Sequence, residues 1–365
     1  MTHAHWRADS QLAPLKLAII ADPYIRVPPL HYGGIERVID LLVDGLINRG
    51  HQITLLAHPD SHTRAKQIAY GAPPHFGIRN RSVELSQVGA ALWRARHNID
   101  IVHSFGRLAA LLPVLPLRGL GKIQSYQRVP VPWKSIKIAA KLAGDSVLFT
   151  GCSTSVYAGA GRSPRAGQWA TVFNGVPMSR FDFVGTVAND APLIFLGRIE
   201  RIKGAHSAIA IAKAVGRRLI IAGNRAESGE ELGYFEREVA PHLSNGFVEY
   251  LGQIDDAQKN MLLGSAAALL MPVEWEEPFG IVMAEAFACG TPVIGFRRGS
   301  VSEVIEDEVT GFVVNNVSEA VRAVAKLPSI SRRAARNRCE RLFSESVVVD
   351  EYEKLYRAIA GRLRQ

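Results

Sequence analysis

Short apolar runs alternate with segments of helical periodicity along almost the whole chain, and this alternation constrains the fold more than any other feature. The apolar runs are nearly continuous in aliphatic or β-branched residues, as strands buried on both faces of a parallel sheet should be. They are residues 15–21, 52–57, 100–105, 122–127, 146–152, 170–175, 192–197, 217–223, 247–252, 266–272, 291–296 and 311–314. This order predicts an α/β protein with doubly wound parallel sheets.

A stretch of small and polar residues divides this pattern into two halves. The segment FDFVGTVANDAP, near residues 182–192, is typical of a linker. We therefore expect two Rossmann-like doubly wound domains facing a cleft, formed by residues 14–185 and 186–345. Residues 346–365 have the spacing of a helix, and residues 1–13 read as a flexible polar tail.

Composition narrows the class of protein. A chain of 365 residues that is 47% hydrophobic can fill two cores. The three cysteines are scattered, which indicates neither a disulfide framework nor a thiolate metal site. The apolar run Leu17–Ala21 is too short for a signal peptide or a membrane span. These features predict a cytoplasmic protein.

The charge is uneven along the chain. Residues 1–185 hold 21 Lys and Arg against 10 Asp and Glu, whereas residues 186–365 hold 22 against 24. The basic half should attract an anionic partner such as a phospholipid surface, a lipid phosphate or nucleic acid. Aromatic residues do not alternate with these cations as they would in a single-strand groove, so no nucleic acid is expected.

Two motifs in the chain suit a phosphate-bearing ligand. Gly33 and Gly34 precede an amphipathic helix, where small residues let a ligand approach the backbone; a tight turn explains the pair equally well. In FLGRIERIKG, Arg198 and Lys203 follow a strand end, and two such cations could bind a diphosphate. Ordinary surface charge is the alternative for this second pair.

The stretch EWEEPFGIVMAEAFACGTPVIGF is the most informative part of the chain. Pro278 predicts a helix from about Phe279 to Ala288, with Glu277 at its start and Glu285 two turns in. Eight residues span roughly 12 Å of helix, about the distance from the sugar to the ribose of a nucleotide diphosphate sugar.

The same stretch suggests a role for each group. The free N–H groups of Phe279, Gly280 and Ile281 would face the phosphates. Glu285 could accept hydrogen bonds from the ribose. Favourable interaction with the helix dipole would explain Glu277 without any ligand, but it would not explain an acidic residue as deep in an apolar helix as Glu285.

These motifs resemble those of a known family. GRIERIKG, EPFGIVMAEAFACGTPVIGFRRGSVSEVI and TGFVV are similar to the C-terminal signature of the retaining family-4 glycosyltransferases, whose E-x7-E pair falls on Glu277 and Glu285. YGGIERV, DIVHSF and VFNGVP match that family's N-domain loop, catalytic-histidine region and interdomain strand. The resemblance spans nearly the whole chain in the correct order.

The resemblance implies a GT-B fold, with the nucleotide sugar held by the C-terminal domain and the acceptor by the N-terminal domain. Arg198 and Lys203 would neutralise the diphosphate, Glu285 would bind ribose and Glu277 would contact the donor sugar. Gly33, Gly34 and Asn174 would join the substrate site. The family transfers sugar with retention and without an essential metal or other cofactor. Its C-terminal helix commonly returns to the N-terminal domain.

One position departs from the family pattern. Many members have H-x-H after the third strand of the N-terminal domain, whereas this chain has His103 and Phe105. His103 is therefore a catalytic candidate, and a buried structural histidine is an equal alternative.

Residues 106–145 combine apolar residues with cations. WKSIKIAAKLAG could form a basic amphipathic helix with Trp133 and Ile136 on one side and Lys134, Lys137 and Lys141 elsewhere, a pattern suited to an anionic membrane. An ordinary helix covering the sheet is the alternative.

The sequence therefore predicts a retaining, metal-independent hexosyltransferase that uses a nucleotide diphosphate sugar, with UDP favoured over GDP-mannose. Its acceptor would be a glycan, lipid-linked or small-molecule hydroxyl, as in polysaccharide biosynthesis. Two alternatives remain at this level: a sugar-nucleotide epimerase or phosphorylase of the same plan, and a non-catalytic nucleotide- or nucleic-acid-binding protein.

Overall fold

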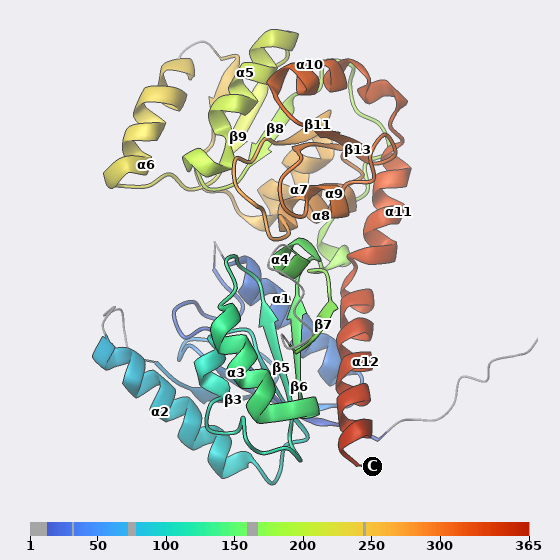
Figure 1. The fold of residues 1–365 in the computed structure, drawn as a ribbon. Helices are drawn as coiled ribbons and strands as arrows, with labels where there is room; N and C mark the ends of the chain where they lie inside the picture. The colour runs from blue at the N-terminus through green and yellow to red at the C-terminus, as the bar shows by residue number, and fades with distance from the viewer. Residues whose placement is uncertain (1–12, 31–32, 72–77, 159–166, 244–245, 365) are drawn as a thin grey trace, which may run out of the picture.

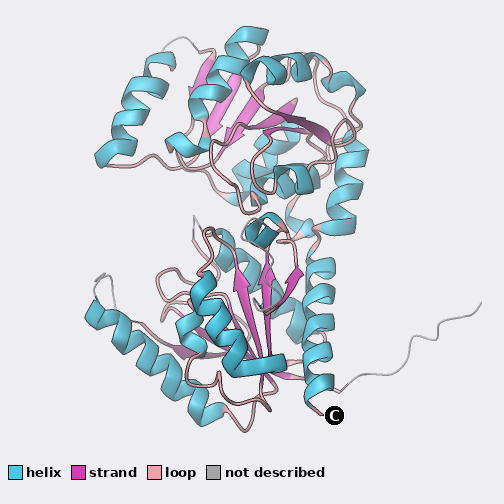
Figure 2. Ribbon diagram, in the orientation of Figure 1, coloured by secondary structure: helices cyan, strands magenta, loops and turns pink. Residues whose placement is uncertain are grey.

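A computed structural model describes residues 13–30, 33–71, 78–158, 167–243 and 246–364. The predicted tail, residues 1–13, lies outside the described residues except for Ala13. Within the described ranges the chain forms two parallel sheets with helices on both faces, arranged as two lobes (Figures 1 and 2).

The N-terminal sheet has the strand order β3-β2-β1-β4-β5-β6-β7. Its strands are β1 Lys16–Ile20, β2 Gln52–Ala57, β3 Lys66–Ala69, β4 Ile101–Ser104, β5 Gly121–Tyr126, β6 Val147–Gly151 and β7 Gln168–Thr171. Its helices are α1 Gly34–Asn48, α2 Ile78–Ala95, α3 Trp133–Ala143 and α4 Ser155–Ala158. The central strands β1 and β4–β6 are almost wholly buried, which explains their continuous apolar sequence.

The C-terminal sheet has the order β10-β9-β8-β11-β12-β13. Its strands are β8 Leu193–Leu196, β9 Leu219–Ala222, β10 Val248–Tyr250, β11 Ala268–Met271, β12 Val293–Phe296 and β13 Gly311–Val314. Its main helices are α5 Ala205–Val215, α6 Gly229–Tyr234, α7 Asp256–Ser265, α8 Ile281–Ala288, α9 Val301–Val304, α10 Val317–Ala325 and α11 Arg332–Leu342.

Two strands at the edge of the N-terminal sheet differ from the sequence prediction. The short strand β3 carries Lys66 and Gln67 and has no buried residue, so it lacks the apolar run on which the prediction relied. The run 170–175 is strand only to Thr171, because its partner β6 ends at Gly151, opposite that residue. The chain beyond it is free to turn towards the interdomain cleft.

The last helix, α12 Glu345–Leu363, packs on the N-terminal domain (Figure 1). Its side chains Val348, Val349, Tyr352 and Tyr356 join the apolar cluster that also contains strand β1. Gly45 on α1 permits the close approach, since an added methyl group there would lie 2.4 Å from Val349. The chain thus ends on the domain where it began.

The two domains are also joined directly by hydrogen bonds near the cleft. At the start of α4, the backbone N–H groups of Thr154 and Ser155 donate to the two carboxylate oxygens of Glu303, over 2.7 and 2.8 Å. The Ser153 hydroxyl donates to the carbonyl of Pro278 over 2.6 Å. This contact holds the N-terminal domain against the loop that contains Glu277.

Replacing Glu303 with alanine removes the acceptor for two N–H groups at this contact. We expect Glu303→Ala to lower the free energy of unfolding by about 1–3 kcal/mol in urea denaturation. The matched control is Glu230→Ala, at an exposed glutamate on α6. Equal effects of the two substitutions would show that the Glu303 contact contributes nothing to stability.

Candidate active site

A cavity of about 560 Å³ lies between the two domains, beyond the carboxyl ends of strands from both sheets. Of the eleven residues that the sequence predicted for the site, ten line this cavity: Gly33, Gly34, Asn174, Arg198, Lys203, Glu277, Phe279, Gly280, Ile281 and Glu285. The eleventh, His103, does not. The structure therefore brings together residues from four widely separated segments of the chain.

Two helix N-termini open onto the cavity from opposite domains. An added methyl group on Gly34, the first residue of α1, would lie only 3.9 Å from the Ile281 side chain, at the start of α8. The first N–H groups of each helix have no partner within the helix, and each helix dipole is positive at this end. The start of α8 therefore favours an anion, whereas the start of α1 already carries the carboxylate of Glu36 in its first turn.

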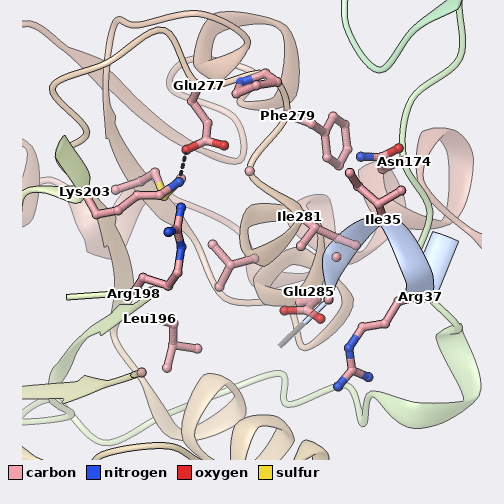
Figure 3. Close-up of a pocket in the computed structure, with 18 of the residues that line it drawn as sticks. Ile35, Arg37, Asn174, Leu196, Arg198, Lys203, Glu277, Phe279, Ile281 and Glu285 are labelled. Carbon is pink, nitrogen blue, oxygen red and sulfur yellow. Dashed lines mark hydrogen bonds and ion pairs between the residues drawn. The ribbon is translucent and has the colours of Figure 1, made fainter. Parts of the chain in front are cut away.

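Lys203 and Glu277 form an ion pair at one side of the cavity (Figure 3). The Lys203 Nζ lies 2.6 Å from the Glu277 Oε2, and the Trp275 indole N–H donates to the same oxygen over 2.9 Å. Lys203 also lies 4.6 Å from the centre of the Trp275 ring. These contacts hold the Glu277 carboxylate in a fixed position while a second cation, Arg198, lies beside Lys203.

Glu285 is placed differently, on the buried face of α8. Only 5% of its surface is exposed, and its Oε1 lies 2.5 Å from the Lys259 Nζ. Lys259 is also 3.4 Å from Asp256, which receives a 2.7 Å hydrogen bond from Arg37 of the other domain. A buried carboxylate deep in an apolar helix is thus compensated by a cation that also lines the cavity.

The start of α8 corrects the sequence prediction by two residues. The helix begins at Ile281, because Gly280 adopts a left-handed conformation with φ 69°. Glu277 and Phe279 therefore lie on the preceding loop, and the estimated 12 Å of continuous helix between the two glutamates is wrong. The N–H groups that open onto the cavity belong to the turn through Gly280 and the first residues of α8.

The Phe279 side chain has a packing role. It is 2% exposed, and its ring lies 6.0 Å from that of Phe173 and 5.6 Å from that of Phe343. These rings join the segment that follows β7, the cavity loop and the residue that follows α11. Phe279 nevertheless lines the cavity, so a contact with substrate stays a prediction.

Two further acidic residues of the same loop make structural contacts. Glu274 lies 2.9 Å from the ring of His206. Glu276 accepts a 2.6 Å hydrogen bond from the Gly299 N–H. Of the three acidic residues before α8, Glu274 and Glu276 therefore make structural contacts, and only Glu277 lines the cavity.

The structure places His103, the catalytic candidate, away from the cavity. The residue is fully buried, and its two ring nitrogens lie 2.7 Å from the hydroxyls of Tyr356 and Ser125. Phe105 and Tyr352 pack against the ring. His103 lies beneath α12 and outside the cavity, a position that favours the structural alternative. Phe105, the departure from H-x-H, belongs to the same packed group.

Sequence reasoning missed several residues that line the cavity. Glu36 is the second residue after the glycine pair, and Gln127 and Arg128 follow strand β5. Their position at strand ends and beside the glycines was the available signal. No sequence pattern indicated that Lys259 belongs to the site, because a lysine within a polar helix is common. It meets Glu285 only in the folded protein.

Comparison with known proteins gives consistent matches. A model described as Glycosyl transferases group 1 matches residues 181–341, and one described as Glycosyltransferase Family 4 matches residues 32–131. A glycogen synthase of Mycobacterium tuberculosis is 24% identical over 371 residues, covering 87% of this chain and 88% of its own.

Solved structures show the same two-domain fold. AviGT4, a glycosyltransferase involved in avilamycin A biosynthesis, is 28% identical with a TM-score of 0.69, covering 96% of this chain and 99% of its own. Anabaena Alr3699/HepE in complex with UDP-glucose has a TM-score of 0.70 at 15% identity, covering 94% and 100%.

The buried His103 should make stability depend on pH. Burial lowers the pKa of its imidazole from 6.5 to about 3. Between these values the unfolded chain binds a proton that the folded protein excludes, so stability is lost as the pH falls through this window, by at most about 1.4 kcal/mol per pH unit. Urea denaturation from pH 7 to pH 4 should show a shallower decline for His103→Gln than for the unmodified protein.

The same variant separates a structural from a catalytic role. His103→Gln should lower stability at pH 7 by about 1–3 kcal/mol, because it disturbs two buried hydrogen bonds. It should leave the affinity for UDP unchanged. Unchanged stability combined with a large loss of transfer activity would restore the catalytic assignment.

Proposed function

Because the chain is a glycosyltransferase of the family-4 type with a GT-B fold, we propose that it moves a hexose-type sugar from a nucleotide diphosphate sugar to a hydroxyl acceptor. The acceptor is a glycan, a lipid-linked saccharide or a small molecule. One observation carries this proposal: the N-terminus of α8 and two cations, Arg198 and Lys203, converge on one interdomain cavity. Such an arrangement stabilises the negative charge of a departing diphosphate.

The cavity residues from the C-terminal domain form what we call the C-terminal wall. Successive residues along this wall suit the diphosphate, the ribose and the sugar of the donor. The diphosphate lies against Arg198, Lys203 and the start of α8. Glu285 accepts hydrogen bonds from the ribose hydroxyls, with Lys259 moving aside or adding a bond. Glu277, held by Lys203, contacts the donor sugar. UDP is favoured over GDP-mannose, which the complex of Alr3699/HepE with UDP-glucose supports at the level of a shared fold.

The proposed reaction retains the configuration of the transferred sugar and uses no metal. As the bond between the sugar and the diphosphate lengthens, negative charge grows on the phosphate oxygens. Fixed positive charges and N–H dipoles stabilise that charge without rearranging. Arg198 can form two parallel hydrogen bonds with phosphate oxygens, and Lys203 adds a compact charge.

We also propose peripheral contact with an anionic membrane at the cytoplasmic face. Helix α3 buries Ile136 but leaves Ile138 61% and Leu142 46% exposed. The lysines of this helix, Lys134, Lys137 and Lys141, are also exposed. Apolar side chains flanked by cations suit the boundary between lipid headgroups and acyl chains. No helix in the described ranges is long and apolar enough to cross a bilayer.

The donor site can be tested by titrating UDP. Arg198→Ala removes a cation from the proposed diphosphate position and should raise the Kd for UDP about 10- to 100-fold, as expected for lost charge-assisted hydrogen bonds. Arg201→Ala is the matched control, because Arg201 pairs with Glu238 and does not line the cavity. If both variants bind UDP equally well, Arg198 does not contact the diphosphate.

Vesicle sedimentation tests the membrane contact. The protein should bind phosphatidylglycerol vesicles more strongly than phosphatidylcholine vesicles, and Ile138→Ser with Leu142→Ser should reduce that binding about tenfold. Met261→Ser is the control, since Met261 is 68% exposed on the C-terminal domain. Equal binding to both lipids, or an equal effect of the control, would refute this contact.

A further inference from the structure

The N-terminal wall of the cavity has polar atoms that the proposed donor site does not use. Gln127 follows β5 and lines the cavity, and neither atom of its amide has a hydrogen-bond partner among the described residues. Asn174 is 8% exposed, and its Oδ1 also has no partner there. Buried polar groups are normally paired, so this wall is suited to a polar ligand.

A carboxylate completes this wall. Glu36, on the first turn of α1, lines the cavity and is 2% exposed. Burial raises the pKa of its carboxyl; its own backbone N–H and the charge of Arg128 lower it, and the charge of Asp22 raises it. Arg128 lines the cavity as well. Glu36, Gln127 and Arg128 thus present an acceptor, an amide and a donor to one space.

Carboxylates offset the positive charge of the guanidinium groups near this wall. Arg107 lies 3.6 Å from Glu84, which also accepts hydrogen bonds from Tyr24. The charge of Arg128 acts on two carboxylates, Asp22 and Glu36. Arg37, which also lines the cavity from α1, is paired with Asp256. Around this wall three carboxylates, those of Asp22, Glu36 and Glu84, therefore lie near the two guanidinium groups of Arg107 and Arg128.

We propose that Glu36, Gln127 and Arg128 form the acceptor subsite, and that it takes the uncharged, hydroxyl-bearing end of a saccharide or polyol in preference to a sugar phosphate. This inference rests on the proposed glycosyl transfer and deepens it. The site is on the acceptor's side of the cavity, opposite the groups assigned to the donor.

The hydrogen-bonding capacity of the three side chains matches neighbouring hydroxyl groups. The Glu36 carboxylate accepts from two hydroxyls, and the Gln127 amide both donates and accepts. Arg128 donates to hydroxyl oxygens while its charge stays balanced by the carboxylates. A phosphate at this position would lie against Glu36 and near Asp22, and repulsion between like charges disfavours it.

The test compares acceptors in matched pairs, using radiolabelled UDP-glucose and UDP-galactose as donors. The neutral members are methyl glucoside, maltose and myo-inositol, and each is paired with its phosphate ester. We expect transfer to at least one neutral compound, with kcat/KM at least tenfold above that of its phosphate. Higher kcat/KM for the phosphates, or no transfer to any neutral compound, overturns the assignment.

Variants locate the subsite. Glu36→Gln should raise the acceptor KM at least tenfold and reduce discrimination against the phosphate ester. Gln127→Leu, which removes no charge, should raise the KM for the neutral acceptor without that change in discrimination. Asp44→Asn is the control: it removes a carboxylate from α1 away from the cavity and should change neither value.

Binding of UDP distinguishes failure of this inference from failure of the proposed function. Both subsite variants should bind UDP within twofold of the unmodified protein. If the unmodified protein binds no UDP and transfers no sugar, the proposed function fails and the subsite fails with it. If UDP binding and transfer are intact but the variants keep the original acceptor preference, the subsite assignment alone is wrong.

Discussion

The contact between the β6–α4 turn and the loop that carries Glu277 is the interaction on which the site depends. The Ser153 hydroxyl donates a hydrogen bond to the Pro278 carbonyl. Glu303 accepts hydrogen bonds from the N–H groups of the next two residues. Because Pro278 is adjacent to Glu277, docking of the N-terminal domain helps to fix the position of a residue that lines the cavity. A site divided between two domains needs such a contact, since neither domain alone encloses a ligand.

With the domains held in this way, the cavity has two walls of different character. The C-terminal wall holds Arg198 and Lys203 and the start of α8, so it favours a diphosphate. The N-terminal wall offers a carboxylate and an unpaired amide, from Glu36 and Gln127, so it favours hydroxyl groups. This difference between the groups on the two walls is the physical basis for our proposal of a donor on one side and a neutral acceptor on the other.

Much of this arrangement was predictable from local sequence patterns. Buried parallel strands are continuous apolar runs, so the central strands were located within one or two residues, whereas the polar edge strand β3 was missed. Glu285 was identified because a carboxylate buried in an apolar helix is costly unless it is paired or binds a ligand. Lys259, its partner, was not, because pairing between α7 and α8 is a tertiary property. His103 likewise carries no local sign that α12 covers it.

The central claim is that the interdomain cavity holds the diphosphate between the start of α8 and the cations of the opposite strand end. A crystal structure of the protein with UDP tests this most directly. The account predicts phosphate oxygens within hydrogen-bond distance of Arg198, Lys203 and the N–H groups at Gly280 and Ile281, with the ribose at Glu285. UDP bound elsewhere, or bound in the cavity with its phosphates against Glu36 and Gln127, would contradict the account.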